Sequence, residues 1–193
     1  MSAITLANPA APTRIPLIQE AEHPELAPLI ADIKAQRGGR FLNLYRTLAH
    51  SPGVAAGWLH LFTELRQKAK LDDASRELAI MRVAVLNGAD YEYQAHIPFS
   101  LQAGITQAQI DALPDWSTAT CYGDKQRAVL AYTDAMTREI HVKEPTFAAL
   151  RPHFDNREIV ELTATIGGYN LVSRFLEAMA MPPEVDHGVR KAG

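Results

Sequence analysis

Apolar residues return every three or four positions along most of this chain, which is the spacing of one face of an α-helix. The helices that this pattern predicts begin at or just after prolines and acidic residues: Pro24, Pro52, Asp72–Asp73, Asp90, Asp124, Pro145 and Asp155. Alternation of apolar and polar residues with period two never continues beyond a few positions, so no strand is predicted. The sequence therefore predicts an all-α fold.

The segment Arg76–Gly104, RELAIMRVAVLNGADYEYQAHIPFSLQAG, combines the most apolar predicted helix with a cluster of polar residues. Its first half is apolar almost all round, which is typical of a helix at the centre of a fold. Asp72–Asp73 is predicted to cap this helix and Gly88 to end it. Asp90 is predicted to cap a second helix that runs through Pro98, and we expect the proline to kink it because proline has no backbone N–H to donate. Further along the chain, Thr106 with Gln109 and Asp155 with Glu158 match the pattern of a capping box.

Glu77 is an acidic residue on an apolar stripe, since Ile80, Met81 and Ala84 follow it at three, four and seven positions. Burial raises the pKa of a carboxyl group, and a raised pKa near the working pH suits a general acid or base. The alternative is a structural role, in which the helix dipole favours an acid in the first turn or an arginine pairs with it.

Glu92 and His96 lie four residues apart and are predicted to meet on one helix face. A carboxylate beside an imidazole orients the ring, fixes its tautomer and raises its basicity. The Tyr93 hydroxyl could donate to a developing oxyanion, and both Tyr91 and Tyr93 are expected to line the same pocket. The alternative is a surface Glu–His pair with aromatic packing around it.

Two segments 81 residues apart are similar: ASRELAIMRVAVL at residues 74–86 and DNREIVELTATIG at residues 155–167. In each of them an Arg-Glu pair opens an apolar helix, Arg76–Glu77 in the first and Arg157–Glu158 in the second. A long amphipathic helix precedes each segment. The pattern predicts a bundle of two related helical hairpins that bury their apolar helices against each other.

Composition and charge narrow the class of protein. The chain has 193 residues, of which 47% are hydrophobic and 21% charged, with a formal net charge of −3. These values are ordinary for a globular protein and give no electrostatic reason to expect nucleic acid or an anionic membrane as a partner. No apolar run approaches the roughly 20 residues that span a bilayer, and the first residues lack the pattern of a secretory signal. A cytoplasmic location is therefore expected.

The expected organisation is one helical domain over residues 23–181. Residues 1–22 contain three prolines and no helical periodicity, so they are expected to form an extended arm. Residues 182–193 begin with a pair of prolines and are expected to be a loose tail.

Cys121 is the only cysteine, which excludes an intramolecular disulfide and a dithiol redox centre within one chain. The histidines show no metal-binding spacing, and no glycine-rich phosphate loop is present. The residue pattern therefore favours acid/base chemistry at Glu77, Glu92 and His96.

The segment RELAIMRVAVLNGADYEYQAHIPFSLQAGIT, and more loosely ELTATIGGYNLVSRFLEAM, resembles the carboxymuconolactone decarboxylase family, which includes the alkylhydroperoxidase D-like proteins. The peroxidase branch of that family carries a glutamate, a CxxC pair and then a histidine. Glu77 and His96 match the outer members of that pattern, whereas Ala89 and Glu92 occupy the cysteine positions. The chain is therefore similar to the cysteine-less branch, without the dithiol mechanism.

This resemblance implies an alkylhydroperoxidase D-like helical bundle that assembles into homo-oligomers, whether dimers, trimers or hexamers. In decarboxylase members the substrate is a small carboxylated lactone from aromatic compound degradation, and neither a metal nor an organic cofactor is needed. It implies carboxy-lyase chemistry with His96 as the general acid/base, tuned by Glu77 and Glu92. A cation must hold the substrate carboxylate, and Arg82 and Arg174 are the candidates.

Two other functions stay open at this point. A non-catalytic oligomeric scaffold or small-molecule binder would retain the fold, and a solvent-facing His96 would favour it. A peroxidase with an external thiol would depend on Cys121, which has no partner nearby in the sequence.

Overall fold

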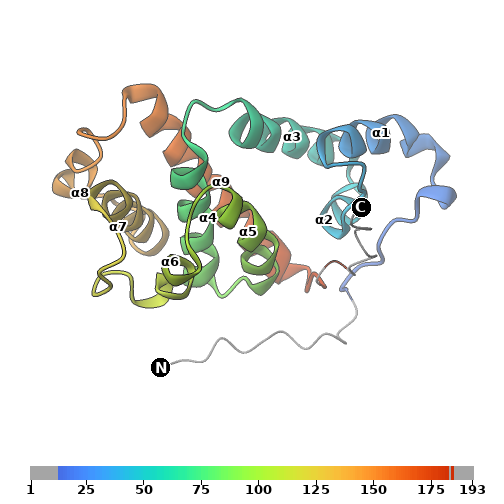
Figure 1. Ribbon diagram of the computed structural model, residues 1–193. Helices are drawn as coiled ribbons and strands as arrows, with labels where there is room; N and C mark the ends of the chain where they lie inside the picture. The colour runs from blue at the N-terminus through green and yellow to red at the C-terminus, as the bar shows by residue number, and fades with distance from the viewer. Residues whose placement is uncertain (1–12, 183, 185–193) are drawn as a thin grey trace, which may run out of the picture. The chain divides into compact units, whose positions relative to one another are not determined.

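The computed structural model describes residues 13–182 and 184, and these residues form helices and no β-strand (Figure 1). The all-α prediction is therefore confirmed. The α-helices are α1 (Ala27–Gln36), α2 (Asn43–Leu48), α3 (Pro52–Thr63), α4 (Asp73–Asn87), α5 (Asp90–Gln102), α6 (Gln107–Asp111), α7 (Asp124–Arg138), α8 (Glu144–Ala148) and α9 (Asn156–Ala178). Three 3₁₀-helical turns, η1 (Glu20–Glu22), η2 (Pro24–Leu26) and η4 (Leu113–Asp115), and one π-helical turn, η3 (Glu64–Lys68), complete the described elements.

The chain packs as two compact units. Among the described residues, one unit contains Phe62–Glu177, and the other contains residues 13–61 together with residues 178–182 and 184. The predicted single domain of residues 23–181 stays a prediction. Most of the predicted arm and tail falls outside the residues that the structure describes.

Helix α4 lies at the centre of the first unit, where it packs against α5 and α7 (Figure 1). Every residue from Ser75 to Ala84 is buried, as its apolar pattern predicted. Asp72 caps it, because the Asp72 side chain accepts a hydrogen bond from the Ser75 amide at 2.9 Å. Gly88 ends it with a φ of 63°, a left-handed conformation that glycine adopts at little cost.

The helix after this break starts differently from the prediction. Asp90 was expected to cap α5, but the cap position belongs to Ala89 and Asp90 is the first helical residue. An acidic residue in the first turn still interacts favourably with the helix dipole. The helix continues through Pro98. Further on, Thr106 and Gln109 form the predicted capping box of α6.

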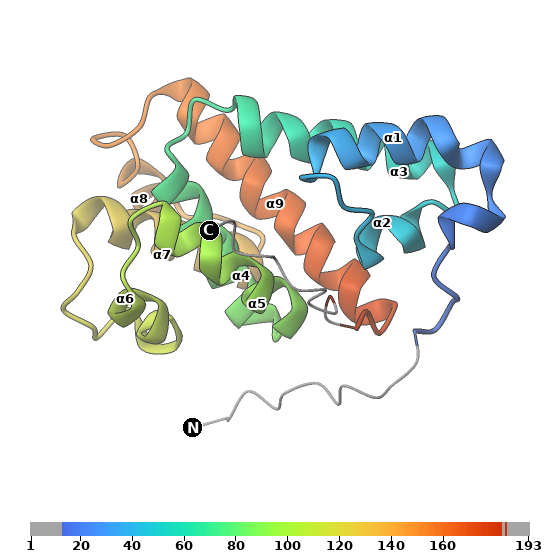
Figure 2. The same cartoon turned by 45° about the vertical axis from the view of Figure 1, so that its right-hand side comes forward.

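Helix α9 is a single helix of 23 residues (Figure 2). Asp155 and Glu158 form the predicted reciprocal cap, with N–H to carboxylate distances of 2.8 and 2.9 Å. The helix continues through Gly167 and Gly168. Gly168 lies against the Phe62 ring, where a Cβ atom would be only 3.2 Å from the nearest ring carbon.

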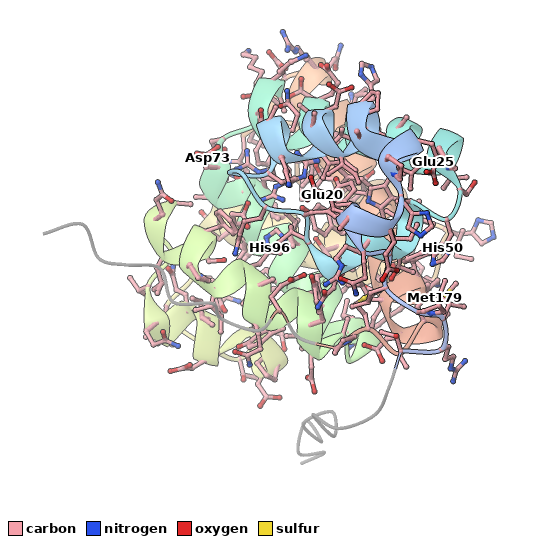
Figure 3. All side chains as sticks on the ribbon, turned by 90° about the vertical axis from the view of Figure 1, so that its right-hand side faces the viewer. Glu20, Glu25, His50, Asp73, His96 and Met179 are labelled. Atoms are coloured by element: carbon pink, nitrogen blue, oxygen red, sulfur yellow. The ribbon has the colours of Figure 1, made fainter. Side chains whose placement is uncertain are left out.

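The second unit has its own small core of Ile18, Leu26, Ile30 and Ala49. Figure 3 labels several of its polar residues, among them Glu20 and His50. The described part of the predicted arm is held in place by hydrogen bonds, since Arg46 donates to the Ile18 carbonyl at 2.9 Å and His50 pairs with the Pro16 carbonyl at 2.8 Å.

Candidate acid/base site

Glu77 of α4 and His96 of α5 form a direct pair in the first unit. The Nδ1 atom of His96 lies 2.7 Å from the Oε2 atom of Glu77, and the side chains are almost fully buried, at 1% and 6% residue exposure for Glu77 and His96. The two residues meet because α4 packs against α5. His96 therefore does not face solvent, and its ring orientation is fixed by a carboxylate.

The surroundings of Glu77 and His96 determine which of the two side chains carries a proton at neutral pH. Burial would raise the pKa of Glu77, but the hydrogen bond and charge of His96, together with Arg76 and Arg66, hold that pKa below its usual value. Burial lowers the pKa of His96 despite the opposing effect of Glu77. At neutral pH the pair is thus a carboxylate and a neutral imidazole whose proton sits on Nδ1. The Nε2 lone pair is then free to act as a base, since no described residue forms a hydrogen bond with it.

Arg76 completes the carboxylate's surroundings. Its Nε atom donates to the Oε1 atom of Glu77 at 3.2 Å, and its Nη1 atom donates to Asp73 at 2.8 Å. Figure 3 labels Asp73 at the start of α4 together with His96. Both oxygens of Glu77 are therefore engaged, which keeps this acid ionised.

Two aromatic rings enclose His96. The Tyr169 ring of α9 packs edge-on against it, with centroids 5.2 Å apart, and the Phe99 ring lies at 5.7 Å. Burial raises the pKa of the Tyr169 hydroxyl, so it stays a neutral donor, and it has no hydrogen-bond partner among the described residues. Tyr169 was not among the predicted site residues. Its position in the second repeat copy was the available signal, but periodicity alone does not show which helix faces His96.

Glu92 behaves differently from the prediction. It was expected to meet His96, yet its Oε2 atom accepts a hydrogen bond from the Ser173 hydroxyl at 2.9 Å. Its Oε1 atom has no partner among the described residues, and Glu92 is 2% exposed. Burial raises its pKa well above the usual value, opposed by Ser173 and reinforced by Glu177, which favours the uncharged carboxylic acid over the carboxylate.

The tyrosines of α5 do not join the pair. Tyr93 is half-buried, and its pKa is raised by burial and by the charge of Asp111. Tyr91 is half-buried as well, with no described contact to His96. The role of both residues in a substrate pocket stays a prediction.

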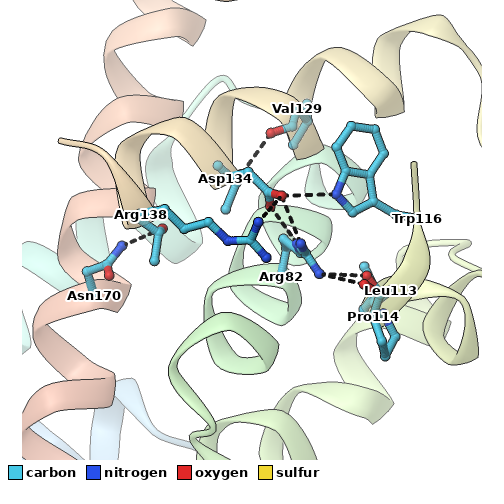
Figure 4. Close-up of polar contacts among 10 residues, drawn as sticks. Arg82, Leu113, Pro114, Trp116, Val129, Asp134, Arg138 and Asn170 are labelled. Atoms are coloured by element: carbon cyan, nitrogen blue, oxygen red, sulfur yellow. Dashed lines mark hydrogen bonds and ion pairs between the residues drawn. The ribbon is translucent and has the colours of Figure 1, made fainter. Parts of the chain in front are cut away.

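The two predicted anion-binding arginines are engaged elsewhere. Arg82 is buried and forms two hydrogen bonds to Asp134, at 2.6 and 2.8 Å, and a third to the Leu113 carbonyl at 2.7 Å (Figure 4). Trp116 donates to the same aspartate. Arg174 is exposed and donates to Asn170. Arg82 has no free edge for a substrate carboxylate, and neither arginine forms part of the site proposed below.

Cys121 lies in the connection between α6 and α7. It is exposed, and its carbonyl accepts a hydrogen bond from Gln109 at 2.9 Å. No described contact links it to Glu77 or His96. The geometry therefore gives Cys121 no part in the acid/base pair.

The chain is similar to known proteins in part of its sequence and in its fold. Residues 52–135 match the sequence profile of the carboxymuconolactone decarboxylase family. The uncharacterized protein YnjA of Escherichia coli K12 is 29% identical over 133 residues, covering 66% of this chain and 68% of YnjA. The residues that match the family profile include both Glu77 and His96 of the pair.

Solved structures share the fold. An uncharacterized peroxidase-related protein from Ralstonia eutropha JMP134, an alkylhydroperoxidase AhpD core, has a TM-score of 0.77 at 23% identity, covering 92% of this chain and 95% of that one. The debrominase Bmp8, in complex with 2,3,4-tribromopyrrole, has a TM-score of 0.72 at 20% identity, covering 90% of this chain and 93% of that one. These likenesses confirm the predicted AhpD-like helical fold. None of the described helices is long and apolar enough to cross a membrane.

Proposed function

Residues 52–135 of this chain belong to the carboxymuconolactone decarboxylase family, and on that premise we propose that the protein catalyses proton transfer on a small organic acid or lactone. The reaction would be of the decarboxylase or lyase type and would need no cofactor. Fold and family alone do not carry this proposal, because related folds host different chemistries and one structural neighbour is a debrominase.

The observation that carries the proposal is the buried Glu77–His96 pair. Glu77 accepts the Nδ1 proton of His96, which leaves Nε2 as the reactive atom. A carboxylate that orients an imidazole also stabilises the imidazolium that forms when Nε2 takes a proton. This arrangement supports a general base that becomes a general acid within one turnover.

In a decarboxylation, the bond between the carboxylate and its carbon breaks, CO2 leaves, and the electron pair stays on the carbon framework conjugated with the lactone carbonyl. A proton must then reach carbon to complete the product. In the proposed mechanism, His96 takes that proton from solvent on Nε2 and delivers it to carbon. The neutral Tyr169 hydroxyl would donate to the developing oxyanion, a role for which neutral, partner-free donors are suited.

Glu92 would serve as a tuning group and not as a partner of the imidazole. It bonds to Ser173 and not to His96, and burial favours its uncharged form, so it does not compete with Glu77 for the His96 proton. It also provides a second buried proton donor in the same unit, held by Ser173.

The test uses 4-carboxymuconolactone, with CO2 release as one readout and deuterium exchange from solvent into small lactones, followed by NMR, as the other. We expect His96→Ala to lower turnover by about 10²- to 10⁴-fold, the usual contribution of a general acid or base. Circular dichroism should show unchanged helical content. His141→Ala, which removes an exposed histidine, is the matched control and should retain full turnover.

Full turnover in His96→Ala would refute the site assignment. A wild-type protein that neither releases CO2 nor exchanges deuterium would favour the non-catalytic scaffold or binder. Peroxide turnover that survives alkylation of Cys121 would remove the external-thiol peroxidase. Assembly into a dimer, trimer or hexamer and a cytoplasmic location stay predictions, and light scattering of the purified protein measures the first.

A further inference from the structure

Arg66 is a cation beside the acid/base pair that the proposed mechanism has not used. It lies in the middle of η3, the π-helical turn Glu64–Lys68, and π-helical turns are frequent at functional sites. The carbon at the centre of its guanidinium group is 5.0 Å from the centroid of the Phe99 ring. Phe99 is in turn the ring that lies 5.7 Å from His96. One phenyl ring thus bridges the guanidinium and the imidazole.

The guanidinium of Arg66 has no polar partner within the described part of the chain, although its side chain is half-buried. Its neighbour Glu64 pairs instead with Lys68 at 2.6 Å. Within residues 62–177 every other arginine forms a hydrogen bond or an ion pair with an oxygen: Arg76, Arg82, Arg127, Arg138, Arg151, Arg157 and Arg174. Five N–H donors on a half-buried group therefore face no acceptor among the described residues.

The charge of Arg66 reaches the catalytic groups. It lowers the pKa of Glu77, of His96 and of Tyr169, each of which is buried. These effects agree with the geometry, in which Arg66 and His96 both contact the Phe99 ring.

We propose that Arg66 binds the carboxylate of the substrate and so selects anionic substrates for the Glu77–His96 pair. This inference rests on the proposed function for its reaction but not for its binding step. The planar guanidinium presents parallel N–H groups that match a carboxylate in a bidentate manner. Phe99 is 40% exposed, and its face supplies an apolar surface for the substrate ring beside the anchored carboxylate.

The probe is 5-oxotetrahydrofuran-2-carboxylate, a saturated carboxylated lactone, with its uncharged methyl ester as the matched ligand. Isothermal calorimetry on the full chain at low ionic strength should show that the wild type binds the acid about tenfold or more tightly than the ester. Arg66→Gln should weaken binding of the acid by about 10- to 100-fold and leave binding of the ester unchanged. Arg66→Lys should fall between the two, because a lysine keeps the charge but loses the bidentate geometry.

Arg151→Gln is the matched control, because Arg151 also stacks on a phenylalanine, Phe147, at 5.5 Å, but pairs with Glu144. It should bind the acid as the wild type does. Equal affinity of the wild type for acid and ester, or full affinity for the acid in Arg66→Gln, would overturn the inference. Circular dichroism of each variant separates lost binding from lost folding.

The two proposals fail separately. If His96→Ala keeps its affinity for the acid while turnover is lost, both stand. If His96→Ala remains active and Arg66→Gln loses affinity for the acid, the anion site stands and the proposed reaction falls. If Arg66→Gln binds the acid normally while His96→Ala is inactive, only the anion site falls.

Discussion

The Arg-Glu pairs at the start of α4 and α9 are equivalent in sequence and have opposite surroundings. Glu77 is buried, accepts a hydrogen bond from Arg76 and holds His96. Glu158 is only half-buried, and its carboxylate accepts from the backbone amide of Asp155. The first pair supports the candidate chemistry, whereas the second supports the end of a helix.

The difference follows from where each helix begins. Glu77 is the fifth residue of α4, which starts at Asp73, whereas Glu158 is the third residue of α9, which starts at Asn156. A glutamate at the third position reaches back to the cap residue, and this is the capping-box geometry. Two residues further into the helix, the same side chain projects toward a neighbouring helix. A small shift in helix start thus separates a glutamate that caps its own helix from one that is buried against a neighbouring helix.

The largest expected effect comes from removing each glutamate in turn. Glu77→Ala should lower the free energy of unfolding by about 3–5 kcal/mol, because it leaves Arg76 and His96 without their buried carboxylate. Glu158→Ala should cost only about 1 kcal/mol, the usual value of a helix cap. Urea unfolding at pH 7 measures both values. Similar losses of unfolding free energy in the two variants would show that Glu77 and Glu158 contribute alike to stability, contrary to the difference in their surroundings.

A second, smaller effect concerns Glu92 and Ser173, which occupy equivalent positions 81 residues apart and bond to each other. The folded-state pKa of Glu92 is raised, so its contribution to stability is complete below its unfolded pKa and is lost as pH rises. Glu92→Gln keeps the acceptor and removes the titration. We expect the variant to gain about 1–3 kcal/mol relative to the wild type between pH 5 and pH 9.

Urea unfolding at several pH values checks this expectation, with Glu158→Gln as the control on the surface. The Glu77–His96 pair has the opposite sign, since both pKa values are lowered. Its contribution is present above the unfolded pKa values and is lost as pH falls. A Glu92→Gln gain that did not increase with pH would contradict a protonated Glu92.

The smallest effect distinguishes two adjacent glycines. Where α4 ends at Asn87, the equivalent part of α9 continues through Gly167 and Gly168. Gly167→Ala should raise the free energy of unfolding by about 0.5–1 kcal/mol, because open space surrounds it and alanine favours a helix. Gly168→Ala should gain less or lose stability, since the new Cβ would press on Phe62. Equal gains in urea unfolding would show that the Phe62 ring yields freely.

Local interactions in this chain were predictable from the sequence, and long-range ones were not. Asp72, Thr106 and Asp155 cap their helices with partners three residues away, so short patterns reveal them. Glu92 was predicted to turn to His96, four residues away, but it bonds to Ser173 on a different helix. Spacing within one helix predicts which residues share a face, but it does not predict which distant helix packs against that face.

The acid/base pair itself was only partly visible in the sequence. Glu77 and His96 stood out because each lies on or beside an apolar stripe, but Arg66 carried no such signal. Its direction depends on a π-helical turn, and a shift from i→i+4 to i→i+5 hydrogen bonding leaves no mark on hydrophobic periodicity. Arg82 stood out as a cation near the site, yet its guanidinium is satisfied by Asp134.

The π-helical turn at Glu64–Lys68 also bears on how this protein can evolve. Such a turn accommodates one more residue than an α-helical turn, so loss of a single codon from this stretch would restore regular α-helical pairing. Each residue removed rotates the side chains that follow by about 100° around the helix axis. One short deletion before Arg66 would therefore turn its guanidinium away from Phe99 while leaving Glu77 and His96 untouched. If Arg66 anchors the substrate as proposed, insertion or deletion at η3 would change substrate choice with no substitution in the acid/base pair.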